Sequence, residues 1–371
     1  LQHAKEWGLR QFVDAAFSGE SVNNTESRAA LHTALRRPVN SPLWHDGVDV
    51  MQQIEGALGR MEDWVQRLHR GELLGAGGKA VTDVIHLGIG GSDLGPLMLH
   101  HALQPYKQTD VKFHFFGNVD RGYLQLCLSK INPASTMVIV VSKSFTTYET
   151  LTNAGWVRDW MQSAGMSSAM IDSAFYAVTA HAERAVKSGV DEARTLPLWD
   201  WVGGRFSLWS AVSVSVAMAI GMANFRLLLA GACAMDEHFQ SAPWSSNLPV
   251  IMGLLGVWYG NVLQAPTQAI ISYSEYLRYF KDYCQQQQME SLGKSVSRFG
   301  ESLAYSTGRV IWGGVGSHTQ HSFHQLLMQG THAVPVDFIL PLHGYSGERN
   351  DDLIANCLAQ AEVLWNGEGA D

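Results

Sequence analysis

A short apolar run constrains the fold of this chain more than any other feature. Residues 137–141 read Met-Val-Ile-Val-Val, and a β-branched run of this kind indicates a strand buried on both faces, as in a parallel sheet. The next six residues carry four hydroxyls and the ammonium of Lys143, and a helical pattern begins at residue 148. Because the first N–H groups of a helix lack internal partners and carry partial positive charge, this turn suits a phosphate monoester. A Ser/Thr-rich helix N-cap is the structural alternative.

Strand-like and helical patterns alternate along much of the chain. Strands are predicted at residues 84–89, 111–116, 137–141 and 175–179, and a second set at residues 268–273, 309–312 and 334–339. Residues 1–70 and 207–259 look mostly helical, and residues 341–350 indicate a surface loop. Since strands that alternate with helices are typical of a parallel sheet with crossover helices, we predict an α/β fold of two units joined by helices.

The composition fits a well-buried enzyme of ordinary size. The chain has 371 residues, of which 46% are hydrophobic and 16% charged, enough for two domains with their own cores. Its net charge of −8 argues against a nucleic-acid surface, although a local cationic cluster can still bind a small anion. The four cysteines lie far apart without metal-ligand spacing, so we expect reduced thiols and a cytoplasmic location. We recognise no signal peptide and no apolar stretch that suits a membrane.

A second turn follows the strand at residues 84–89. Residues 88–96 read Gly-Ile-Gly-Gly-Ser-Asp-Leu-Gly-Pro, and glycines allow a backbone to approach a ligand closely. The spacing matches neither the dinucleotide fingerprint nor the Walker pattern, so a dehydrogenase is disfavoured. A purely structural tight turn is the alternative for this segment alone. Because parallel strands of one sheet end on the same side, this turn and residues 142–147 can converge on one anion.

Three further clusters carry reactive side chains. Arg205 follows a di-glycine at the mouth of a helix, Glu290 lies between a helical stretch and a glycine turn, and His321 stands at the predicted start of another helix. Each has a structural alternative: a surface ion pair for the arginine, a solvated glutamate, and a helix-edge histidine without function. We find no metal-ligand motif and no nucleophile elbow, so no metal is expected.

Together these motifs resemble glucose-6-phosphate isomerase (phosphoglucose isomerase), in its bacterial form. The resemblance rests on residues 88–96, 142–147, 201–209 and 289–291, in the family's order and spacing, and runs from about residue 18 to about residue 367. It implies two sugar-isomerase (SIS) type doubly wound parallel-sheet units flanked by helices. The implied division is a helical N-terminal part of the large domain at residues 1–58, a small domain at 59–231, and the large domain at 232–371.

The family's functional residues carry over onto matching positions. The resemblance implies that Glu290 moves the proton, that Arg205 stabilises the negative intermediate, and that His321 helps to open the sugar ring, oriented by Glu149. Gly204 would contact the substrate. The phosphate would be held by Gly91, Ser92, Ser142, Lys143, Ser144 and Thr147.

The resemblance also implies a reaction and an assembly. The expected reaction interconverts glucose 6-phosphate and fructose 6-phosphate through a cis-enediol(ate), in glycolysis and gluconeogenesis, without a cofactor. The expected assembly is a homodimer in which His321 crosses the interface. Family members continue beyond the position of Asp371 with a segment that supplies a glutamine and a lysine, so we expect the large domain to lack its C-terminal part.

Two alternative functions stay open at this point. One is a non-catalytic sugar-phosphate-binding module, which Glu290, Arg205 and His321 disfavour because a sensor needs no base. The other is an isomerase that also accepts mannose 6-phosphate, left open because Leu292 and residues 318–319 depart from the family pattern.

Overall fold

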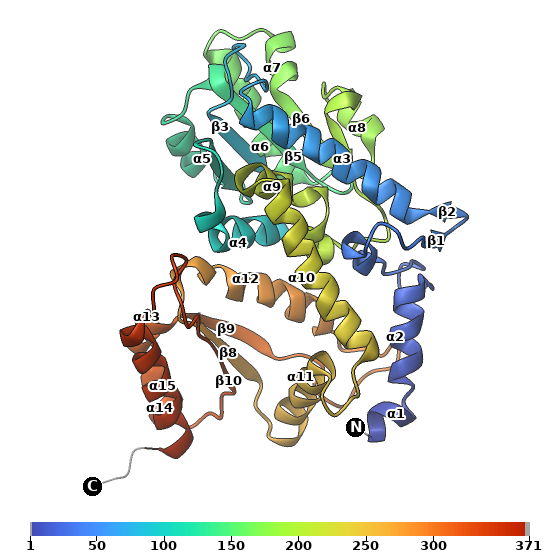
Figure 1. The fold of residues 1–371 in the computed structure, drawn as a ribbon, viewed down its shortest axis with the longest axis vertical. Helices are drawn as coiled ribbons and strands as arrows, with labels where there is room; N and C mark the ends of the chain where they lie inside the picture. Colours follow the sequence, from blue (N-terminus) through green and yellow to red (C-terminus); the bar gives the residue numbers. More distant parts are fainter. Residues whose placement is uncertain (1, 368–371) are drawn as a thin grey trace. The chain divides into compact units, whose positions relative to one another are not determined.

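The structure is a computed structural model that describes residues 2–367. These residues form two units, an N-terminal unit of residues 2–100 and 106–241 and a C-terminal unit of residues 101–105 and 242–367. Residues 1 and 368–371, with which the predicted first and last domains begin and end, lie outside the described residues. Figure 1 shows the ribbon of both units.

The N-terminal unit is built on a five-stranded parallel sheet of order β4-β3-β5-β6-β7. The strands are β3 (Asp83–Leu87), β4 (Lys112–Phe116), β5 (Thr136–Val141), β6 (Phe175–Thr179) and β7 (Thr195–Pro197). All residues of β3, β5 and β6 are buried, as the apolar runs predict. The first four predicted strands and the parallel arrangement are therefore confirmed.

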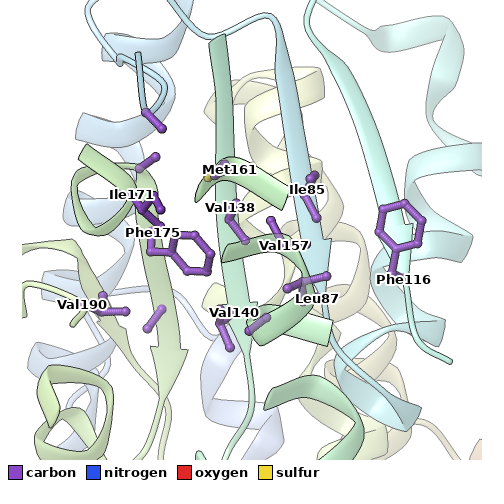
Figure 2. Close-up of a cluster of buried hydrophobic side chains, with 14 of the residues drawn as sticks. Ile85, Leu87, Phe116, Val138, Val140, Val157, Met161, Ile171, Phe175 and Val190 are labelled. Atoms are coloured by element: carbon purple, nitrogen blue, oxygen red, sulfur yellow. The ribbon is translucent and has the colours of Figure 1, made fainter. Parts of the chain in front are cut away.

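Helices cover both faces of this sheet. The main helices of this unit are α2 (Leu9–Ser18), α3 (Val50–His69), α4 (Leu94–Ala102), α5 (Arg121–Leu128), α6 (Tyr148–Ser163), α7 (Ser168–Ala174), α8 (Ala182–Lys187), α9 (Val214–Ile220) and α10 (Met222–Ser241). On one face, strand residues such as Ile85 and Val138 pack against Val157 of α6, and Figure 2 shows this cluster. Alternate strand residues point to the other face, where Tyr176 meets Trp64 of α3. The unit is thus doubly wound.

The strand order places a topological switch point between β3 and β5. Across the sheet, the strands are the second, first, third, fourth and fifth of this sheet along the chain, which is the flavodoxin-like order. From the first strand, β3, one crossover leads to β4 on one side and the next to β5 on the other. Leu87 pairs with Val140, so the two strands reach the same edge together. The turns that follow them begin about one strand spacing apart, where α/β proteins of this plan bind ligands.

The C-terminal unit holds a smaller parallel sheet of order β10-β8-β9. Its elements are α11 (Leu248–Val257), β8 (Thr267–Ser272), α12 (Phe280–Gln285), β9 (Val310–Val315), α13 (Gly316–Gln320), α14 (His324–Gln329), β10 (Val336–Ile339) and α15 (Asp351–Asn366). Tyr273, at the end of β8, and Cys357 of α15 lie in its core. The second set of predicted strands is confirmed, with the chain crossing over between them as expected.

The structure also differs from the sequence prediction in places. The edge strand β7 was not predicted, because a three-residue Thr-Leu-Pro segment carries almost no periodic signal. The helical region at 207–259 is interrupted, since Gly221 adopts a φ of 80° between α9 and α10 and residues 242–247 separate α10 from α11. None of the helices described is both long and apolar enough to cross a membrane.

Candidate active site

The turn after β5 is folded by its own hydroxyls. The Oγ of Ser142 lies 3.0 Å from Oγ1 of Thr147 and accepts a 3.1 Å hydrogen bond from the backbone N–H of Phe145. The Oγ of Ser144 accepts the hydroxyl of Thr146 at 2.8 Å. Phe145 holds a left-handed φ of 51° with its ring buried, a conformation that costs energy in a non-glycine residue and that the packed ring maintains. The turn is therefore held in one shape before any ligand arrives.

Helix α6 starts at this turn without a side-chain cap. Thr147 stands at the N-cap, yet its hydroxyl makes no capping bond, and the other turn hydroxyls bond ahead of the helix. The hydroxyl-capped helix start, the structural alternative for this segment, is therefore not formed. Glu149 lies half-buried in the first helical turn. This helix start retains the partial positive charge that favours an anion.

The Lys143 ammonium is directed at backbone carbonyls of another segment. Its Nζ donates to the carbonyl oxygens of Asp200 at 2.8 Å and Val202 at 2.9 Å, and lies 3.8 Å from the Asp200 carboxylate. Burial lowers the pKa of Lys143, and the Asp200 carboxylate partly opposes this. Lys143 thus ties the turn after β5 to the segment that leads to Arg205.

The turn after β3 is compact enough to require its glycines. A Cβ at Gly88 would lie 2.4 Å from the carbonyl oxygen of Ser92, and Gly90 has a φ of 59°. The same carbonyl accepts a 2.7 Å hydrogen bond from Nε2 of His86, whose Nδ1 lies 2.8 Å from Oγ of Ser215. Ser92 itself is half-buried. The predicted phosphate ligand Ser92 therefore lies in a turn that is fixed through its backbone.

Gly91 brings the turn after β3 against the di-glycine segment. A Cβ at Gly91 would lie 2.1 Å from the carbonyl oxygen of Gly204 and 2.6 Å from the backbone nitrogen of Arg205. Ser207 donates its hydroxyl to the Gly204 carbonyl at 2.7 Å and lies 3.4 Å from the Gly91 carbonyl. The structure thus brings together Gly91, Gly204 and Arg205, which are far apart in the sequence.

Aromatic and cationic groups surround Arg205. Its guanidinium lies over the ring of Phe206, with the carbon 5.1 Å from the ring centroid. The His32 ring stacks on the same Phe206 ring, with the two centroids 4.5 Å apart. Burial, with the guanidiniums of Arg36 and Arg205, lowers the pKa of His32 to about 4. His32 is therefore neutral at physiological pH and adds no positive charge beside Arg205.

Asp93 is an unusual carboxyl next to the Ser92 turn. Burial raises its pKa to about 6, and its Oδ1 has no hydrogen-bond partner among the described residues. A Cβ added at Gly117 would lie 2.5 Å from the other carboxyl oxygen of Asp93, Oδ2. Gly117, at the end of β4, is therefore required for the close approach of this carboxyl.

Glu290 and His321 belong to the C-terminal unit. Glu290 is exposed at the end of a π-helical turn, η10 (Gln286–Glu290), and the Nζ of Lys294 donates to its carbonyl oxygen at 2.7 Å. Where a π-helical turn interrupts an α-helix, it is frequently at a functional site. His321 is exposed, and the prediction that it starts a helix is wrong. His321 is the C-cap residue of α13, and the next helix, α14, begins only at His324.

Sequence reasoning missed two groups at this edge of the sheet. The sequence pattern shows His86 only as part of an apolar strand, and Asp93 only as part of a glycine-rich turn. A histidine flanked by Ile85 and Leu87 in a buried strand is itself a signal, because a buried polar group needs partners from elsewhere in the fold. Among the described residues, no group of three His, Cys, Asp or Glu side chains is arranged to hold a metal ion.

Comparison with known proteins gives a consistent result. The family model described as Phosphoglucose isomerase matches residues 1–371. Curated relatives called glucose-6-phosphate isomerase include those of Hahella chejuensis, 46% identical over 99% of this chain and 66% of the relative, and a Marinomonas species, 48% identical over 98% and 67%. The chain spans about two thirds of the length of these relatives. The crystal structure of a glucose-6-phosphate isomerase from Chlamydia trachomatis superposes with a TM-score of 0.86 at 34% identity, covering 99% of this chain and 72% of that one.

Proposed function

The chain belongs to the phosphoglucose isomerase family, and on this premise we propose that it interconverts glucose 6-phosphate and fructose 6-phosphate. The observation that carries the proposal is the edge of the sheet at the β3–β5 switch point. Two hydroxyl-bearing turns begin there side by side, and one of them lies against the backbone of Arg205. An anion receives neutral hydroxyl donors and a helix start in that place.

In this proposal the phosphate is the anchor of the substrate. The hydroxyls of Ser92, Ser142, Ser144 and Thr147 donate to it, and Gly91 allows the backbone to approach. Lys143 acts with them or holds their position through its carbonyl contacts. Because the phosphate lies at the far end of the sugar from the reacting carbons, its binding energy serves to position them.

The proposed chemistry moves one proton between neighbouring carbons. After ring opening, Glu290 removes the proton from carbon 2 of the aldose, and the electrons of that C–H bond form the double bond of an enediolate. The proton then returns to carbon 1, and the hydroxyl proton of O2 passes to O1, so that carbon 2 becomes the ketone. Arg205 stabilises the negative charge, which exists only along the reaction path. His321 aids ring opening, with Glu149 orienting it.

A coupled assay with fructose 6-phosphate tests the activity directly. We expect turnover by the wild type and a loss of about two decades or more in kcat for Glu290→Gln, with KM little changed, since the variant keeps the size of the side chain but removes the base. Glu301→Gln, an exposed glutamate of the same unit, is the matched control. Near-normal turnover in Glu290→Gln would remove Glu290 from the role.

We also propose the cytoplasmic homodimer, with His321 acting across its interface, and the domain division at residues 58 and 231. The assembly can be tested by mixing two inactive variants. If His321 reaches the site of the partner, equal amounts of Glu290→Gln and His321→Ala should exchange subunits and regain about a quarter of the wild-type sites, since one site of each mixed dimer is intact. No regain after demonstrated exchange contradicts the shared site.

A further inference from the structure

The strongest unassigned contact near the proposed site is the pair of hydrogen bonds on His86. Both His86 and Ser215 are fully buried, with no exposed surface. The Nε2 of His86 lies 2.7 Å from the carbonyl oxygen of Ser92, and Nδ1 lies 2.8 Å from Oγ of Ser215. A carbonyl oxygen can only accept, so Nε2 must carry the proton, and Nδ1 must accept from the Ser215 hydroxyl. The two partners thus select one tautomer.

The peptide that His86 contacts is also fixed from other directions. The N–H of Ser92 donates to the Ile89 carbonyl at 3.2 Å, and the N–H of Asp93 donates to the Gly90 carbonyl at 3.0 Å. The Ser92 carbonyl is pressed toward Gly88, where a Cβ would stand 2.4 Å away. The backbone N–H of Ser92 is therefore used within the turn, and the hydroxyl is the donor that this residue can offer to a ligand.

We propose that His86 is a positioning residue, whose Nε2–H, held in one tautomer by Ser215, fixes the Ser92 peptide so that the Ser92 hydroxyl is aimed at the phosphate of the substrate. The inference rests on the proposed function, because it assigns a purpose to the geometry of that same anion site. It makes His86 more than a core residue: an apolar side chain would fill the space beside Phe115, yet would leave the Ser92 carbonyl and the Ser215 hydroxyl without partners.

The protonation state of His86 agrees with this geometry. Burial lowers its pKa to about 4, and the Ser92 carbonyl opposes the change only in part. The imidazole is therefore neutral over the range in which a sugar phosphate is doubly ionised. A neutral donor keeps the same hydrogen bond throughout that range, whereas a titrating group would exchange its contact with pH.

Binding of inorganic phosphate to the full chain tests the proposal without relying on turnover. Calorimetry with His86→Leu should give a phosphate Kd about tenfold weaker than wild type, because one hydrogen bond to the anion is misdirected. His86→Gln, whose amide can donate from a position near that of Nε2, should stay within about threefold of wild type. Ser215→Ala should give an intermediate loss, and KM for fructose 6-phosphate should follow the same order while kcat changes less.

A merely structural histidine would give a different pattern. It would lower the melting temperature of each variant while the folded fraction bound phosphate normally, and that result overturns the inference.

The ¹⁵N spectrum of His86 provides an independent measure of the tautomer. We expect a protonated Nε2 in wild type, and a protonated Nδ1 overturns the inference as well. If wild type binds neither inorganic phosphate nor sugar phosphate, the proposed function fails, and the inference fails with it. Weak phosphate binding in His86→Leu alongside tight binding in wild type and in His86→Gln supports both.

Discussion

Replacement of Gly91 by alanine gives the sharpest test of the site geometry. The added Cβ would lie 2.1 Å from the Gly204 carbonyl oxygen, whereas real Cβ atoms essentially never come within 3.0 Å of another heavy atom. The two segments must therefore separate by about 0.9 Å, and both obstacles are backbone atoms that cannot rotate away. The φ of Gly91 is not in the left-handed region, so the substitution adds contact without adding backbone strain.

The size of the effect follows from that displacement. The Arg205 nitrogen lies 2.6 Å from the same added carbon, so the arginine moves with the segment. A shift of about 1 Å at a reacting centre can cost about 10²-fold in rate, which corresponds to about 3 kcal/mol of transition-state stabilisation. Overpacking of a tight contact costs a similar free energy, about 1–3 kcal/mol, if the protein resists the shift instead. We therefore expect kcat/KM for fructose 6-phosphate to fall about a hundredfold, or the melting temperature to fall.

The assay pairs steady-state kinetics with thermal unfolding of each variant. Gly155→Ala is the matched control: it is the same chemical change, it lies inside α6, and its Cβ would have no heavy atom within 4 Å. Alanine there should leave activity unchanged and raise stability slightly, as it does in most helix interiors. If Gly91→Ala matches Gly155→Ala in both measurements, the turn after β3 does not touch the Arg205 segment, and the reasoning fails.

Two further predictions concern half-buried ionisable groups. Lys143→Met keeps the aliphatic stem but removes both carbonyl contacts, so we expect kcat to fall together with a rise in KM, whereas loss of a simple phosphate ligand would change KM alone. Asp93→Asn tests the sign of a linkage. The folded-state pKa of Asp93 is raised, so the ionised carboxyl destabilises the fold. As the pH falls from 7 toward 4, the free energy of unfolding of wild type, measured in urea, should therefore rise by up to about 3 kcal/mol relative to that of Asp93→Asn.

Much of the fold follows from the sequence because its strands are buried on both faces. Residues 137–141 can form little else than a central strand, and the parallel plan places its end beside that of β3. The convergence of the turns at residues 88–96 and 142–147 on one edge could therefore be predicted from strand patterning alone. The short edge strand β7 could not, since a sheet edge needs few residues and tolerates proline.

The contacts that hold the site in shape were much harder to predict. His86 meets Ser215 across 129 positions of sequence, and Lys143 meets the Val202 carbonyl across 59, so no local pattern reports either pair. The sequence also suggested that the Lys143 ammonium serves the phosphate, since a lysine in a hydroxyl-rich turn carries that chemistry. In the structure its Nζ also contacts the backbone carbonyls of Asp200 and Val202. Every residue possesses a carbonyl oxygen, so these contacts leave no trace in the sequence, and the role of Lys143 toward the phosphate stays a prediction.

The segment that carries Arg205 is held at two points, and this has a measurable consequence. Lys143 binds it through the carbonyls of Asp200 and Val202, and Gly91 supports it at Gly204. If both contacts position the same segment, either change already displaces the arginine, and the second change then has less effect on it. The double variant Gly91→Ala with Lys143→Met should therefore lose less in kcat/KM than the product of the single losses, with a coupling of about 0.5–3 kcal/mol. Strictly multiplicative losses would mean that the two residues act on separate parts of the site, since independent sites add in free energy.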